Sequence, residues 1–163
     1  MEEKIFVGIG QIVYANKKIL ICPGIGSCLA LVVRNRRTGY SGIAHVFLPE
    51  PPSGIQQTAL PGKYANQAVK ILLEGILKEP HSCAEDLEAY QAGGACMFHF
   101  QQIAPTNNIG ALNIEAVDKA LQDYGIHIVF SDIGGNQART VEFDCSKGIM
   151  MVATKEKGRM VYG

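Results

Sequence analysis

The chain contains no tryptophan, no excess of either charge and no uninterrupted hydrophobic run long enough to span a membrane. Its 15 Lys and Arg residues balance its 15 Asp and Glu residues, so the formal net charge is zero. Non-specific nucleic-acid binding needs a basic surface that displaces counterions, and the balanced charge argues against such a surface. The most apolar stretch, residues 19–33, is interrupted by Pro23 and two glycines. We therefore expect neither membrane insertion nor a nucleic-acid partner.

The chain also lacks the marks of secretion and of metal binding. Its N-terminus is acidic where a signal peptide is basic, and no long apolar segment follows it. The cysteines are odd in number and form no Cys-x-x-Cys pair, which argues against a disulfide framework and against a zinc site. These cysteines are Cys22, Cys28, Cys83, Cys96 and Cys145. We expect a cytoplasmic protein with free thiols and no metal.

Length and hydrophobic patterning predict one domain spanning residues 1–163. Short apolar segments predict strands over residues 5–7, 12–14, 18–22, 29–33, 42–48, 87–92, 126–130, 140–144 and 150–154. The run over residues 29–33 is apolar throughout, as expected for a strand buried on both faces, and the segment over 42–48 is expected to pair with it.

Two amphipathic segments predict helices. The first spans residues 63–78, with a core face formed by Ala65, Ala68, Val69, Leu72 and Ile76, and the second begins with Asn113 as its N-cap and stops at Gly125. Gly75, inside the first helix, costs about 1 kcal/mol relative to alanine. Strands outnumber helices, and the helices must cover a sheet. The prediction is therefore a mixed α/β, α+β-like fold: a layered sandwich of β-sheet covered by two main helices.

The segment Pro23-Gly24-Ile25-Gly26-Ser27-Cys28 is the most informative motif for chemistry. Glycines at such a turn let successive N–H groups point into one concavity, which stabilises a developing oxyanion and favours a thiolate. The competing interpretation is a tight turn followed by a buried, inert cysteine, because free cysteines are usually buried. A dinucleotide-binding loop is not favoured, since Leu29 stands where the third glycine belongs.

His45 is the second candidate, because it is a titratable ring in an otherwise apolar segment. Alternation places it on the strand face shared by Ile43 and Phe47. If the two apolar strands pair, Cys28 and His45 can approach each other, and a thiol beside an imidazole is a minimal activated nucleophile. The competing interpretation is a core or surface histidine that bonds a carbonyl.

Three further clusters of glycine and polar residues predict either capped turns or loops that shape a groove for an extended substrate. They lie around Gly94, around Asn108 and around Asn136. Arg139, which follows the last of them, is interpreted as a member of a surface ion pair rather than as a substrate-binding cation.

Six motifs, in order along nearly the whole chain, resemble the chemoreceptor glutamine deamidases of the CheD family. They are Gly24-x-Gly26-Ser27-Cys28, Ala44-His45-x-x-Leu48-Pro49, Lys63-Tyr64-Ala65, Gly93-Gly94-Ala95-x-Met97-Phe98, Asn108-Ile109-Gly110-x-x-Asn113 and Gly134-Gly135-Asn136-x-x-Arg139. The resemblance implies a cytoplasmic α/β sandwich with a papain-like Cys–His pair on an unrelated fold. It implies hydrolysis of Gln side chains of bacterial chemoreceptors to Glu, and it raises receptor methyl-ester hydrolysis as a second reaction.

The resemblance implies that Cys28 is the nucleophile and His45 the general base, with no cofactor. Gly26, Ser27, Gly94 and Asn136 are expected to form the oxyanion and substrate loops. The family commonly carries a threonine six residues before the nucleophile, and here Cys22 occupies that third catalytic position. The implied partners are the cytoplasmic domain of a chemoreceptor and the chemotaxis phosphatase CheC.

Two other functions stay open at the level of sequence. The first is a binding module with little hydrolysis of its own that regulates a CheC-like phosphatase. The replacement of the family's threonine by Cys22 makes this reasonable, because a thiol is a weaker hydrogen-bonding group than a hydroxyl. The second is a redox-sensing thiol protein, for which Cys22 is the nearest resolving partner of Cys28 in sequence.

Overall fold

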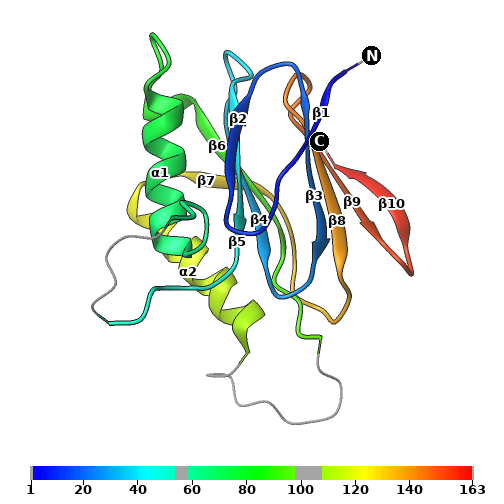
Figure 1. The fold of residues 1–163 in the computed structure, drawn as a ribbon. Helices are drawn as coiled ribbons and strands as arrows, with labels where there is room; N and C mark the ends of the chain where they lie inside the picture. Colours follow the sequence, from blue (N-terminus) through cyan, green and yellow to red (C-terminus); the bar gives the residue numbers. More distant parts are fainter. Residues whose placement is uncertain (1, 54–58, 98–107, 163) are drawn as a thin grey trace.

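The chain folds into three layers in the computed structural model, which describes residues 2–53, 59–97 and 108–162. Two helices lie against one face of a five-stranded sheet, and a second five-stranded sheet stacks on its other face (Figure 1). The helices are α1 (Ala65–Leu77) and α2 (Ile109–Asp123), and a short 3₁₀ turn, η1 (Ala84–Asp86), precedes the sixth strand. This arrangement confirms the mixed α/β sandwich expected from the sequence.

We call the sheet beneath the helices the central sheet and the other the outer sheet. In spatial order, the central sheet contains β2 (Ile12–Ala15), β5 (Ser41–Val46), β4 (Leu29–Asn35), β6 (Leu87–Gly93) and β7 (His127–Ile133). The outer sheet contains β1 (Lys4–Phe6), β3 (Ile19–Ile25), β8 (Arg139–Asp144), β9 (Ile149–Thr154) and β10 (Gly158–Tyr162). The expected pairing of residues 29–33 with 42–48 is confirmed as the antiparallel pair β4–β5.

The strand β4 runs through the middle of the protein and contributes to two hydrophobic cores. Leu29, Leu31 and Val33 pack toward the helices, whereas Ala30 and Val32 pack between the two sheets. Successive strand residues point to opposite faces, so a strand covered on both sides must be apolar throughout. This explains the continuous apolar run and confirms that the strand is buried on both faces.

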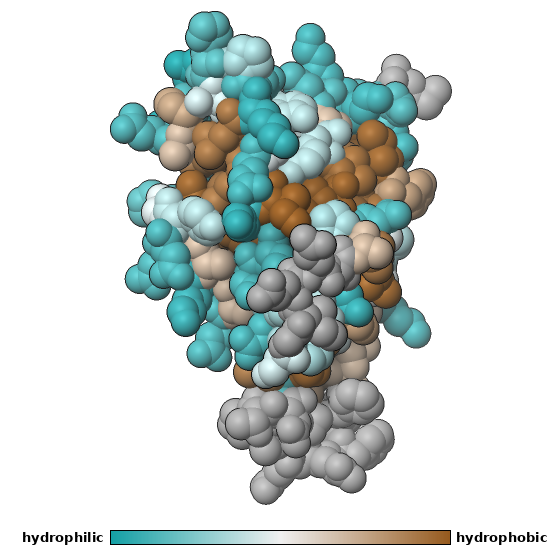
Figure 2. Space-filling model, turned by 60° about the vertical axis from the view of Figure 1, so that its left-hand side comes forward, coloured by the Kyte–Doolittle hydropathy of each residue, from teal (hydrophilic) through white to brown (hydrophobic). Residues whose placement is uncertain are grey.

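The helix α1 buries the face expected from its hydrophobic spacing. Its buried residues include every predicted core position, namely Ala65, Ala68, Val69, Leu72 and Ile76. Its polar residues face outward, and the helix-bearing side shows hydrophobic residues in a band between hydrophilic ones (Figure 2). No helix in the described ranges is both long enough and apolar enough to cross a bilayer.

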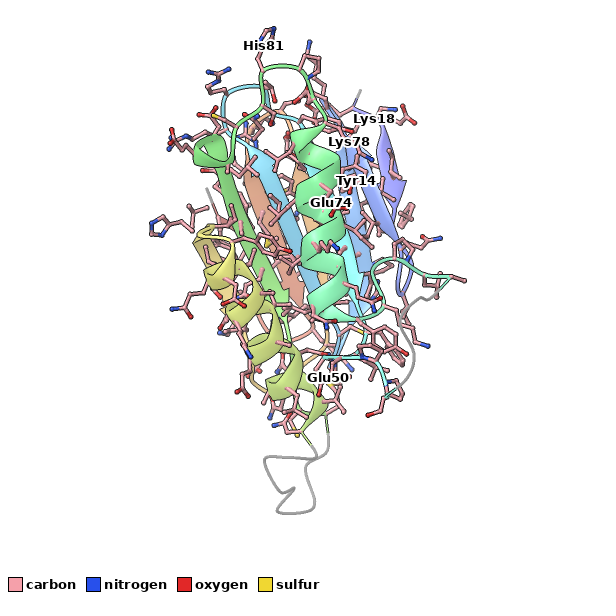
Figure 3. All side chains as sticks on the ribbon, turned by 90° about the vertical axis from the view of Figure 1, so that its left-hand side faces the viewer. Tyr14, Lys18, Glu50, Glu74, Lys78 and His81 are labelled. Atoms are coloured by element: carbon pink, nitrogen blue, oxygen red, sulfur yellow. The ribbon has the colours of Figure 1, made fainter. Side chains whose placement is uncertain are left out.

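The glycine in this helix has a packing role that helix propensity does not reveal. A Cβ atom on Gly75 would lie 2.1 Å from the Tyr14 hydroxyl oxygen, far inside contact distance. That hydroxyl donates to the main-chain oxygen of Ile71 at 2.7 Å. Figure 3 shows Tyr14 against α1, beside Glu74. The absence of a side chain at Gly75 therefore allows Tyr14 of β2 to pack against the main chain of α1.

Two local predictions were wrong, and one strand was missed. The N-cap of α2 is Asn108, whose side chain accepts from the Ala111 N–H at 3.0 Å, whereas Asn113 is fully buried inside the helix. The strand β3 does not stop at Pro23 but continues to Ile25, because a register shift against β8 accommodates the proline at a bulge. The strand β10, which pairs with β9, was not predicted.

Candidate active site

Figure 1 shows the turn that connects β3 to β4. Cys28 is the last residue of this turn, immediately before the first residue of β4. Its side chain belongs to the hydrophobic core between the two sheets, and only 7% of the residue is exposed. Gly24, which lies in β3 at the register shift against β8, has φ = 64°, a value that favours glycine. The glycine-rich turn expected from sequence therefore ends in a nearly buried thiol.

Main-chain hydrogen bonds hold the turn from the side of β6. The Ala95 N–H donates to the Gly26 carbonyl at 2.9 Å, and the Gly94 N–H donates to the Cys28 carbonyl at 2.8 Å. Gly94 has φ = 68°, which lets the chain leave β6 and turn back onto the loop. We call residues 93–95 the hook. Because the Gly94 N–H is engaged in this contact, its role in the structure is to hold the Cys28 main chain.

His45 lies in β5 directly opposite Ala30 of β4. Cys28 precedes Ala30 by two residues, so it shares the same sheet face and is the diagonal neighbour of His45. Diagonal neighbours in an antiparallel pair lie about 7 Å apart at the backbone, within reach of an imidazole ring. The strand register thus places both residues on the face of the central sheet that lines the inter-sheet core, at the same end of β4 and β5.

The His45 ring is oriented by the main chain of a third segment. Its Nδ1 atom lies 3.2 Å from the carbonyl oxygen of Val7, which follows β1. The Val7 N–H in turn donates to the Ile21 carbonyl at 2.8 Å, which fixes Val7 against β3. A carbonyl only accepts, so Nδ1 must carry the proton and Nε2 is left as the basic nitrogen. Nε2 is buried and has no hydrogen-bond partner among the described residues.

Burial opposes ionisation of both side chains. It raises the pKa of the Cys28 thiol above its ordinary value of 9.0, against a smaller lowering by the Cys28 N–H. It lowers the pKa of His45 below 6.5, against a smaller opposing effect of the Val7 carbonyl. Low-polarity surroundings disfavour the charged forms of both groups. Both shifts favour the neutral thiol and the neutral imidazole, so the expectation that the glycine-rich turn favours a thiolate was wrong: burial outweighs the N–H contact.

Cys22 lies in β3 and is fully buried in the same core as Cys28. Burial, reinforced by the nearby Cys28 thiol, raises the pKa of Cys22 to about 12. The contact that orients His45 comes from the Val7 carbonyl and not from the Cys22 side chain.

The other predicted site residues lie in the turn and in the loop after β7. A Cβ on Gly26, in the turn, would lie 3.4 Å from the side chain of Met97, which is exposed. Asn136 is exposed in the loop after β7. That loop is joined to the segment beyond the hook, because the Cys96 N–H donates to the Gly135 carbonyl at 2.9 Å.

Arg139 is buried and not on the surface, contrary to expectation. It forms an ion pair with Asp132 at 3.3 Å and donates to the Gly134 carbonyl at 2.8 Å and to the Gly93 carbonyl at 3.4 Å. The guanidinium fork presents several donors at fixed angles, which suits several acceptors at once. Arg139 therefore ties the loop after β7 to the hook.

Sequence reasoning missed two groups beside the candidate pair. The Val7 carbonyl has no residue-type signature, because every residue carries one. The second group is Asn113, which was interpreted as a helix cap. The Asn-Ile-Gly-x-x-Asn motif contains two asparagines, Asn108 and Asn113, and this was the one signal in the sequence that they have different roles. Within the described ranges, no group of three or more His, Cys, Asp or Glu residues could hold a metal ion.

The sequence comparisons identify the family of the chain. The family profile described as "CheD chemotactic sensory transduction" matches residues 47–154. A protein of Thermotoga maritima named "Chemoreceptor glutamine deamidase CheD" is 42% identical over 147 residues, which cover 90% of this chain and 88% of that protein. The chain belongs to the CheD family.

Similarity to other CheD proteins extends over almost the whole chain. An Archaeoglobus fulgidus protein named "Probable chemoreceptor glutamine deamidase CheD" is 35% identical over 160 residues, covering 98% of this chain and 99% of its own length. An Oceanobacillus iheyensis protein of the same name is 35% identical over 147 residues, covering 90% of this chain and 88% of its own length. The family resemblance drawn from the six motifs is therefore confirmed.

Proposed function

We propose that this CheD-family chain is a protein-glutamine deamidase that hydrolyses Gln side chains of a bacterial chemoreceptor to Glu. The relatives carry this activity in their names. The observation that carries the proposal is the placement of Cys28 diagonal to His45, with the Nε2 atom of His45 buried and unpartnered among the described residues. A basic nitrogen beside a thiol is the arrangement that cysteine hydrolases need.

The proposed reaction proceeds in two balanced stages. First, His45 Nε2 takes the thiol proton of Cys28 while the sulfur attacks the carboxamide carbon of the substrate. The tetrahedral intermediate then breaks its C–N bond, and the leaving nitrogen takes the proton from His45 and departs as ammonia. Second, water attacks the thioester while His45 takes one of its protons; the carbon–sulfur bond then breaks to release Glu, and His45 returns the proton to the Cys28 sulfur. No metal or organic cofactor takes part.

Main-chain groups of the turn are the proposed oxyanion donors. The carbonyls of Gly26 and Cys28 point toward the hook, where they accept hydrogen bonds. The N–H groups of Ser27 and Cys28 donate to no main-chain carbonyl among the described residues. Two adjacent N–H groups directed at a developing negative oxygen lower the barrier substantially when they are already in position. We assign Gly26 to turn geometry and Asn136, on its exposed loop, to contact with the substrate chain.

The Val7 carbonyl is proposed as the group that orients His45 during the reaction. It fixes the tautomer in which Nε2 is basic and stabilises the imidazolium formed after proton transfer. This interpretation removes the need for a threonine at position 22. Cys22 then serves as a core residue of β3 and not as a third catalytic group.

Two finer assignments follow from the family resemblance and belong to the same proposal. The substrate is the cytoplasmic part of the receptor, so the protein acts in the cytoplasm. A CheC-like phosphatase is a second partner that competes with the receptor for this chain. Purified receptor fragment should therefore lower the amount of the phosphatase retained on the immobilised protein, and retention that does not change would contradict the shared surface.

The deciding experiment measures ammonia release from a purified cytoplasmic fragment of the cognate chemoreceptor. Mass mapping follows conversion of Gln to Glu for the wild type, Cys28→Ala and His45→Ala. We expect conversion by the wild type alone. Retained conversion in Cys28→Ala would overturn the nucleophile, whereas no conversion by the wild type would favour a binding module that regulates the phosphatase.

A further inference from the structure

A buried asparagine on α2 connects the two segments that carry Cys28 and His45. Asn113 is fully buried, and its side-chain Nδ2 donates to the Ser27 carbonyl at 2.9 Å and to the Phe47 carbonyl at 3.1 Å. These two acceptors are 86 and 66 residues away along the chain, respectively. One amide group therefore bridges three distant segments.

The two carbonyls belong to residues beside the candidate catalytic pair. Ser27 immediately precedes Cys28, and Phe47 follows His45 by two residues. Because β4 and β5 are antiparallel, the first residue of β4 and the last residue of β5 lie at the same end of the strand pair. Ser27 and Phe47 lie just outside the paired strands, since β4 begins at Leu29 and β5 ends at Val46. The amide thus holds the pair together just beyond the last strand pairing.

The helix is seated closely enough to maintain this bridge. A Cβ on Gly110, one turn before Asn113, would lie 2.4 Å from the Gly94 oxygen and 2.5 Å from the Ala95 oxygen. Helix α2 therefore touches the hook directly. Three consecutive carbonyls of the nucleophile turn are held from this side: Gly26 and Cys28 by the hook, and the intervening Ser27 by Asn113.

The bridge is specific for a side chain with two donor hydrogens. An amide nitrogen carries two, one for each carbonyl, whereas a hydroxyl carries one and a carboxylate none. Glutamine, the other amide side chain, would not replace asparagine here, because its amide lies one methylene further from the helix.

We propose that Asn113 is a positioning residue for the deamidation reaction, which sets the distance between the Cys28 thiol and His45 Nε2. This inference rests on the catalytic roles proposed for Cys28 and His45. Asn113 touches neither reacting atom and acts through the main chain of Ser27 and Phe47. Without it, the turn and the end of β5 separate, and the proton transfer between thiol and imidazole slows. A displacement of about 1 Å in a catalytic pair can cost about 100-fold in rate.

The test uses Asn113→Leu, which is nearly isosteric but donates no hydrogen bond, and Asn113→Ala as a second variant without bulk. The matched control is Asn35→Ala. Asn35 is also fully buried and lies at the opposite end of β4, where it donates to the Ser82 hydroxyl at 3.1 Å and accepts from the Arg37 N–H at 3.0 Å. Urea unfolding of each variant shows that the tested protein is folded.

The first readout is the pH profile of Cys28 alkylation by iodoacetamide, followed by mass spectrometry with exposed Cys83 as an internal reference. In the wild type, we expect an inflection below pH 6.5 that disappears in His45→Ala, because neutral His45 assists the thiol. The Asn113 variants should lose this inflection, whereas Asn35→Ala should keep it. The second readout is the receptor deamidation rate, where kcat should fall about 100-fold in the Asn113 variants with KM unchanged.

The outcomes separate this inference from the proposed function. If the wild type itself lacks the inflection linked to His45, the catalytic pairing is wrong. If the wild type shows it and a folded Asn113 variant retains both the inflection and kcat within about threefold, Asn113 does not position the pair. If Asn35→Ala also loses the inflection, its loss follows from removing any buried asparagine contact and not from removing the Asn113 bridge. That result also overturns the inference.

Discussion

The Nδ1 atom of His45 lies 3.2 Å from the main-chain oxygen of Val7, so a peptide carbonyl occupies the place where a catalytic histidine usually meets a side chain. Val7 is fully buried, and its own N–H is bound to the Ile21 carbonyl of β3. The acceptor is therefore held by sheet hydrogen bonding and does not depend on the residue type at position 22. This relationship leads to the first prediction.

Replacing Cys22 by alanine should leave the kcat of deamidation within about threefold of the wild type, because the His45 tautomer is set by Val7. The free energy of unfolding should fall by about 1 to 2 kcal/mol, since the thiol fills space in the inter-sheet core. Steady-state kinetics and urea unfolding measure the two effects separately. Cys22→Thr serves as the comparison, and a loss of 100-fold or more in Cys22→Ala would make position 22 catalytic.

The pH dependence of deamidation should reflect a neutral resting pair. Activity needs His45 as a free base, and burial lowers its pKa below 6.5. The Cys28 pKa is raised above 9.0, so thiolate does not accumulate at neutral pH. We expect kcat/KM to rise with pH through an inflection below pH 6.5 and then to stay level to about pH 9. Ultraviolet absorbance of a thiolate at neutral pH that is lost in Cys28→Ala would instead reveal a preformed thiolate–imidazolium pair.

The stability of the protein should fall on acidification through His45. Protonation of a buried imidazole is disfavoured in the folded state, so its folded pKa lies below the unfolded value of 6.5. The contribution is fully present above pH 6.5 and is lost as the pH falls below that value, with a slope of at most about 1.4 kcal/mol per pH unit. Urea unfolding of the wild type and His45→Gln between pH 5 and 8 measures it. Equal pH slopes for the two proteins would show that His45 does not titrate differently on unfolding.

Gly75→Ala should destabilise the protein, although alanine favours helices by about 1 kcal/mol over glycine. The added methyl would overlap the Tyr14 ring, with distances of 2.1 Å to its oxygen and 2.2 Å to Cζ. Overpacking of this kind costs about 1 to 3 kcal/mol, which thermal or urea unfolding detects. In a Tyr14→Leu background the same change should cost much less, so additive effects in the double-mutant cycle would contradict the proposed clash.

Several elements could be predicted because local patterns determine them. The α1 stripe from Ala65 to Ile76 repeats at helical spacing, and its positions are buried as expected. The uninterrupted apolar run from Leu29 to Val33 indicated a strand covered on both sides, which the two cores confirm. The Gly-x-Gly-Ser-Cys turn and the histidine in an apolar strand are likewise visible in the sequence, because glycine, cysteine and histidine each have distinctive chemistry.

Other features could not be predicted because they depend on how distant segments meet. The sequence contains three asparagines close to the start of α2, at positions 107, 108 and 113. Only the folded structure decides that Asn108 caps the helix while Asn113 bridges Ser27 and Phe47. Pro23 ends a strand by local rules, yet a bulge against β8 lets β3 continue.

Residue types and their spacing are enough to predict the chemical groups of the candidate site and the strands near them. The acceptor that orients His45 and the residue that holds its strand to the nucleophile turn become visible only in the folded chain. Main-chain carbonyls such as those of Val7, Ser27 and Phe47 have the same chemistry at every position. Their partners are therefore selected by proximity in the folded state, which no local pattern records.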